Sequence, residues 1–109
     1  MHRFLAALVV FAGVGLAQIH VPTSQAIAAA ESKPQPEYNA LARQMKVTGD
    51  VSVEVSIATN GAVDDVRVVS GSALLSAPVV KAVKSWRFKP FRQDGTPTKA
   101  KTVLRFTFK

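Results

Sequence analysis

Hydrophobic and polar residues alternate strictly from Val51 to Ile57, with valine or isoleucine at every second position and serine or glutamate between them. Alternation of this kind predicts a β-strand with one buried face. The dipeptide Asn60-Gly61 follows, and Asn-Gly is the strongest short signal for a β-hairpin. A second strand is therefore expected over residues 63–69.

A two-residue turn at this dipeptide fixes which residues of the two strands face each other. Val55 then lies opposite Val66 on the apolar face, and Glu54 lies opposite Arg67 on the polar face. A shift by one residue would place valines opposite charged side chains, so the pattern specifies its own register. One pair near the turn fits badly, because Ile57 would face Asp64.

Two segments carry apolar residues at helical spacing. The first predicts a short helix over residues 37–44. The second predicts a helix that begins after Ser76 as N-cap, has Pro78 in its first turn and ends near Ser85. The apolar stripes consist of Tyr38, Leu41, Ala42 and Met45 in the first helix and Val79, Ala82, Val83 and Trp86 in the second.

A cluster of turn-forming residues at 93–97 precedes the last expected strand, residues 99–109. The order helix, strand, strand, helix, strand predicts a two-layer α+β domain over residues 38–109. Its three-stranded antiparallel sheet would have one face covered by the second helix. Such a sheet has unpaired edges, and an unpaired edge can accept another chain.

The first thirty residues have the pattern of an export signal. A basic start at Arg3 is followed by an uncharged apolar run, and small residues at 26–30 fit an A-x-A cleavage site. We expect cleavage after Ala30. The alternative is an uncleaved membrane anchor formed by residues 4–21. Residues 20–37 hold little that could pack, so residues 31–37 are expected to be a linker.

The composition argues against an enzyme. The chain has no cysteine, and both histidines, His2 and His20, precede the expected cleavage site. The usual general base, zinc ligands and thiol nucleophile are therefore missing from the mature chain. The acidic residues show no spacing typical of a paired acid and base. We therefore expect no catalytic, metal or cofactor site.

The positive charge is concentrated near the carboxyl end. The net charge is +7, and residues 81–109 hold nine Lys or Arg but one acidic residue. Because export argues against a nucleic-acid partner, an anionic cell-wall or envelope polymer is the better candidate. The alternative is a solvated face without a partner. The basic face would consist of Lys81, Lys84, Lys89, Arg92 and Lys99.

Several short motifs, taken in order, resemble one known family. The run Trp86-Arg87-Phe88-Lys89-Pro90, followed by Gly95-Thr96-Pro97, resembles the W-R-F-x-P…G-x-P signature of TonB C-terminal domains. Residues 47–53 resemble the family's entry to its first strand, and residues 60–66 resemble its hairpin. The resemblance covers residues 38–109, although the long Pro-rich spacer of full energy transducers has no counterpart here.

The resemblance implies a non-catalytic periplasmic module that takes part in TonB-dependent transport. In the family, the edge of the final strand takes up a short segment of an outer-membrane transporter by strand addition. Carried over to this chain, the resemblance implies partner-binding residues Lys101, Val103, Arg105 and Thr107, with Gly49 and Asp50 at the neighbouring loop.

Other interpretations of the same residues stay open. Charged side chains on an edge strand also protect it from aggregation, so the four outward side chains have a purely structural explanation. The whole chain could instead be a basic wall-associated domain or a membrane-anchored mini-transducer. A strand-exchanged homodimer is a further expectation for so small a sheet.

Overall fold

The structure, a computed structural model, describes residues 18–109, so the start and most of the apolar run of the expected signal lie outside the described residues. The regular elements are β1 (Gln18–His20), α2 (Thr23–Ala29), β2 (Ala30–Ser32), α3 (Ala40–Gln44), β3 (Gly49–Ile57), β4 (Val63–Ser70), α4 (Ala73–Lys84), β5 (Arg87–Phe88), β6 (Arg92–Gln93), β7 (Thr96–Pro97) and β8 (Lys99–Phe108).

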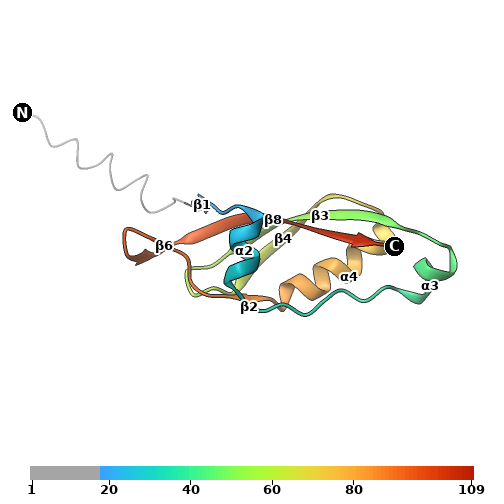
Figure 1. Ribbon diagram of the computed structural model, residues 1–109, viewed down its shortest axis with the longest axis horizontal. Coiled ribbons are helices and arrows are strands. Elements are labelled where there is room, and N and C mark those ends of the chain that lie inside the picture. Colours follow the sequence, from blue (N-terminus) through green and yellow to red (C-terminus); the bar gives the residue numbers. More distant parts are fainter. Residues whose placement is uncertain (1–17) are drawn as a thin grey trace, which may run out of the picture.

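The main sheet has four strands in the order β1-β8-β3-β4, and α4 lies along one of its faces (Figure 1). β3 is antiparallel to both β4 and β8, whereas β1 runs parallel to β8. The predicted α+β fold, with the order α3-β3-β4-α4-β8, is confirmed. The parallel strand β1 was not part of that prediction and makes the sheet four-stranded. Two small ladders, β2–β5 and β6–β7, complete the pairing.

The predicted register of the hairpin is confirmed, but its turn is one residue longer. Val55 faces Val66 and Glu54 faces Arg67. The amide of Gly61 donates to the carbonyl of Ala58 at 2.9 Å, and Gly61 has φ +88°. A tight turn closed by a residue in the left-handed region is the common three-residue hairpin connection.

The longer turn also resolves the poorly fitting pair. The register shifts between Ser56 and Ile57, so Ile57 faces Val63 instead of Asp64. Such a bulge leaves one residue of the strand unpaired and changes the direction in which the neighbouring side chains point. Ile57 is buried as a result, with 1% of its surface exposed.

The helix α4 begins earlier than its sequence signals predict. Ser72 is the N-cap, and its hydroxyl accepts a hydrogen bond from the amide of Leu74 at 3.3 Å, so the assignment of Ser76 as N-cap is wrong. The added turn carries Leu75 into the core, where 1% of its surface is exposed. Burial of that leucine favours the longer helix, even though Pro78 now lies inside it.

The core lies between the sheet and α4 and consists mainly of β-branched residues of β3 and α4. Trp86, expected in an apolar stripe, is buried and so is Phe88, whereas Phe106 is only partly buried against the core. The buried residues of the two layers are Val51, Val53, Val55, Ile57, Leu75, Val79, Val83, Trp86, Phe88, Ala100, Leu104 and Phe108.

The segment before the expected domain packs against it. Val21 is 7% exposed and Ala26 is fully buried, and Ala30 of β2 pairs with Phe88 of β5. The expectation that residues 20–37 hold little that packs is therefore wrong up to Ser32. No helix in the described range 18–109 is long and apolar enough to cross a membrane. Cleavage after Ala30 stays a prediction.

The solvent face of the sheet carries a small charge network centred on Glu54. Its Oε1 atom lies 2.9 Å from Nη2 of Arg67 and 3.8 Å from Nζ of Lys101. The Arg67 side chain is 70% exposed, so water screens the first pair. We expect Glu54→Gln to lower the free energy of unfolding by only about 0.2–1 kcal/mol, measured by urea denaturation. A loss of several kcal/mol would contradict this assignment.

Candidate functional site

The outer edge of β8 is paired along its first half by the chain's own amino-terminal segment. β1 lies parallel to it, with Gln18 opposite Lys99 and His20 opposite Lys101. Just after β1, the amide of Val21 donates to the carbonyl of Lys101 at 2.9 Å. The hydroxyl of Thr23 donates to the carbonyl of Val103 at 2.6 Å. The edge is thus covered as far as Val103.

Beyond Val103 the edge of β8 is free within the described part of the chain. The N–H and C=O of one strand residue point to the same side of the strand, and the side alternates from residue to residue. Because the carbonyls of Lys101 and Val103 point outward, those of Arg105 and Thr107 do so too. An added strand would find these main-chain groups unoccupied.

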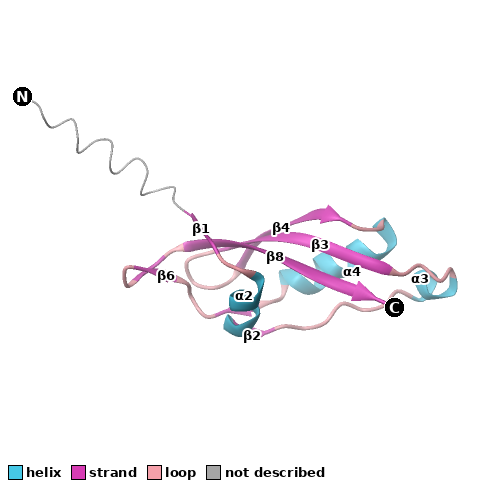
Figure 2. Cartoon of the chain, turned by 45° about the horizontal axis from the view of Figure 1, so that its top comes forward, coloured by secondary structure: helices cyan, strands magenta, loops and turns pink. Residues whose placement is uncertain are grey.

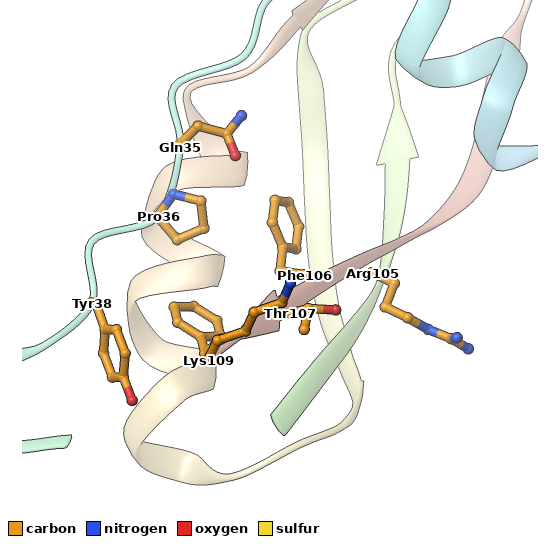
Figure 3. Close-up of a pocket in the computed structure, with 8 residues that line it drawn as sticks. Gln35, Pro36, Tyr38, Arg105, Phe106, Thr107 and Lys109 are labelled. Atoms are coloured by element: carbon orange, nitrogen blue, oxygen red, sulfur yellow. The ribbon is translucent and has the colours of Figure 1, made fainter. Parts of the chain in front are cut away.

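A groove runs beside this free stretch. One pocket of about 360 Å³ lies between residues 35–38 and the end of β8 (Figure 3). A second pocket of about 190 Å³ continues it toward α2 and is lined by Ile27 and Trp86. The two pockets share Gln35, Arg105 and Phe106.

The wall of the groove opposite β8 is fixed by hydrogen bonds at both ends. The indole N–H of Trp86 donates to the carbonyl of Pro34 at 2.9 Å. The hydroxyl of Tyr38 donates to the carbonyl of Val47, and the Tyr38 ring packs edge-on against Phe108 with centroids 5.4 Å apart. A wall held in place before binding loses little entropy when a ligand docks.

The four side chains predicted on the last strand all lie along β8, but their surroundings differ. Lys101 and Val103 belong to the covered half, and Val103 is 44% exposed. Arg105 and Thr107 belong to the free half. Figure 3 shows the Arg105 side chain pointing away from Gln35 and Pro36, on the other face of the strand.

Gly49 and Asp50 do not lie in a loop, as the resemblance implied. They are the first residues of β3 and pair with Phe108 and Thr107, on the side of β8 opposite its outer edge. Asp50 accepts a hydrogen bond from the hydroxyl of Thr107 at 2.7 Å. Asp50 can therefore orient Thr107, but Gly49 and Asp50 themselves do not line the free edge.

Sequence reasoning missed the residues of the groove wall, Gln35 and Pro36, and assigned Tyr38 only to a helix stripe. Residues 33–39 have no regular secondary structure, so no periodicity marked them. Tyr38 was the available signal, because a tyrosine that packs against a core usually needs a partner for its hydroxyl.

The five residues of the predicted basic face are all exposed, but they do not gather on one element. Two belong to α4, one to β6 and one to the start of β8. Figures 1 and 2 place β6 at one end of the molecule and α4 beneath the sheet. Within residues 18–109 there is no group of three or more side chains suited to hold a metal ion.

Residues 34–109 match the family model described as "Gram-negative bacterial TonB protein C-terminal". The chain belongs to the TonB C-terminal domain family. The solution NMR structure of the Pseudomonas aeruginosa TonB CTD matches with a TM-score of 0.63 and 27% identity, over 73% of this chain and 83% of that one. Protein TonB of Escherichia coli (strain K12) is 31% identical over 61 residues, which are 54% of this chain and 26% of that protein.

This TonB C-terminal domain thus spans about a quarter of the curated relative that it matches. The family match begins at residue 34. The free edge of β8 and the groove beside it therefore lie almost wholly inside the family domain, whereas β1, α2 and β2 lie outside it.

Proposed function

We propose that this TonB C-terminal domain is a non-catalytic periplasmic module of TonB-dependent transport. It takes up a short extended segment of an outer-membrane transporter as an added strand on β8. The observation that carries the proposal is the free edge at Arg105 and Thr107, which opens onto a preformed groove. Main-chain bonds to such an edge supply affinity, and every second side chain of the ligand supplies selectivity.

The groove suits the inward side chains of an added strand. On one side it is lined by Phe106 and Phe108, and on the other by Pro36 and Tyr38. An apolar side chain that enters there removes apolar surface from water, about 25 cal/mol for each Å² buried. Outward side chains would lie beside Arg105 and Lys109, so an acidic residue at such a position strengthens binding.

The test is an amide NMR titration of the full chain. The probes are short synthetic peptides that copy periplasm-facing segments of outer-membrane transporters, added at low and at high salt. Shifts that concentrate on residues 104–109 and persist at high salt support strand addition. No shifts with any of these peptides would remove the proposal.

Two substitutions of Arg105 distinguish the contribution of its main-chain N–H to peptide binding from that of its side chain. Arg105→Pro removes an outward N–H that an added strand would use, and proline is tolerated where an edge residue's N–H faces solvent. We expect about fivefold weaker peptide binding, measured by isothermal titration, because a lost main-chain bond costs about 1 kcal/mol. Arg105→Ala is the matched control and should weaken binding less. Equal losses would assign the effect to the guanidinium.

A second candidate is binding of an anionic envelope polymer by Lys81, Lys84, Lys89, Arg92 and Lys99. None of the ion pairs among the described residues involves these five side chains, so their charges are available. Exposed charges lose their attraction as salt is added. Polymer binding that disappears at high salt, together with the absence of peptide shifts, would favour this function.

A further inference from the structure

The segment that covers the first half of the β8 edge lies outside the family domain. The covering segment, residues 18–29, comprises β1 and α2, and the family match begins only at residue 34. Figures 1 and 2 both show β1 beside β8 and α2 below it. Part of the proposed binding edge is thus occupied by a strand from the same chain.

This segment bonds to the outer main-chain groups of β8, which are the groups that an added strand would use. Besides the bonds that the Val21 amide and the Thr23 hydroxyl donate to β8 carbonyls, the carbonyl of Val21 accepts a hydrogen bond from the hydroxyl of Thr102 at 2.8 Å. Thr102 is only 3% exposed, so this hydrogen bond is shielded from water. Val21 supplies a buried side chain at the same point.

The helix α2 extends the cover from the edge to the groove. Ala26 is fully buried, and Ile27 lines the second pocket together with Trp86 and Leu104. The covering segment therefore occupies the main-chain carbonyls of Lys101 and Val103 and also narrows the end of the groove nearest them. A peptide can reach only the remainder, beyond residue 103.

We infer that residues 18–29 are an internal competitor for the partner peptide, which blocks half of the β8 edge until they are removed or displaced. This inference rests on the proposed function. A tethered competitor acts at a high effective concentration, so a free peptide is at a disadvantage for as long as the tether is intact. The closed form would bind a peptide along residues 104–109, and the open form along the whole strand.

The expected cleavage after Ala30 would cut this tether. A peptidase would add one water across the Ala30–Glu31 peptide bond, leaving a carboxylate on Ala30 and an amine on Glu31. The covering segment would then be a separate peptide and its effective concentration would collapse. Processing would thus expose the full edge only after the domain has left the compartment where it was made.

Ala26→Asp tests whether the segment docks as described. A carboxylate at this fully buried position disfavours packing of α2, while residues 34–109 keep their own core. In the full-length chain we expect amide hydrogen exchange to speed up about tenfold at Lys101, which faces β1. The Leu104 amide, which faces β3, should not change. Ser24→Asp, exposed on the same helix, is the matched control. Unchanged exchange at Lys101 would overturn docking.

A reversible lock tests the competition itself. His20 and Lys101 face each other on adjacent strands, about 5 Å apart by the usual strand spacing, which suits a disulfide. The chain has no other cysteine, so His20→Cys with Lys101→Cys forms a single bond. We expect the transporter peptides described above to bind about tenfold more weakly to the oxidised form than to the reduced form.

The outcomes separate the inference from the proposed function. Stronger peptide binding by Ala26→Asp than by Ser24→Asp, together with the effect of the lock, supports the inference. Equal binding by all forms overturns the inference and leaves the proposed function intact. Binding by no form, Ala26→Asp included, removes the proposed function and the competition with it.

Discussion

Trp86→Ala is expected to lower the free energy of unfolding by about 3–5 kcal/mol, because it deletes the largest buried side chain at the junction of the two layers. Trp86 is 3% exposed and contacts Phe88 and Phe106, each with ring centroids 5.9 Å away. A small domain is stable by only about 5–15 kcal/mol, so the variant should melt well below the parent. Thermal unfolding followed by circular dichroism measures the difference.

Two further variants divide this loss between packing and hydrogen bonding. Trp86→Phe keeps much of the apolar volume but removes the N–H that donates to Pro34, so it should cost less and mainly loosen the groove wall. Val69→Ala, at a valine that is 57% exposed, controls for truncation outside the core. A loss at Val69 as large as that at Trp86 would contradict the assignment of the core.

Local patterns were sufficient to predict the elements whose order defines the fold. The alternation in β3 and the matching charges on β4 selected one register, and that register is observed. The sequence also placed Trp86 in the core correctly. In each case the deciding interaction lies between neighbours in sequence or across a short turn, so the pattern itself carries the information.

The features that needed distant partners were not predictable in the same way. β1 has three residues, too few for an alternating pattern, and it pairs with a strand about eighty residues later. Its neighbourhood also has the composition of an export signal, which is normally removed and contributes nothing to the mature fold. The groove wall at Gln35 and Pro36 depends likewise on a hydrogen bond from Trp86.

For the candidate site, the sequence therefore predicted which side chains lie on the last strand, but not which part of its edge is free. The side chains of Arg105 and Thr107 were correctly placed on the last strand, and alternation showed which residues share a face. Whether the edge beside them is free depends on what else pairs with β8. That question is decided by tertiary contacts of residues 18–23, which no local pattern encodes.

Gly61→Ala is expected to destabilise the domain by about 2–5 kcal/mol, by adding a backbone clash to left-handed strain. A Cβ built on Gly61 would lie 1.9 Å from the carbonyl oxygen of Phe88, and the residue has φ +88°. The left-handed conformation alone costs an alanine about 1–2 kcal/mol, and the forced backbone shift adds about 1–3 kcal/mol. That shift would also disturb the bond from the Phe88 amide to the Gly61 carbonyl.

Gly95→Ala is the matched control, because it shares the strain and lacks the clash. Gly95 has φ +81°, and a Cβ there would meet no atom within 4 Å. Its free energy of unfolding should therefore fall by only about 1–2 kcal/mol. Urea denaturation of both glycine variants measures the two losses. If the two variants lose equal stability, Gly61 serves only its turn. A larger loss at Gly61 shows that the close approach of the hairpin turn to Phe88 of β5 also stabilises the domain.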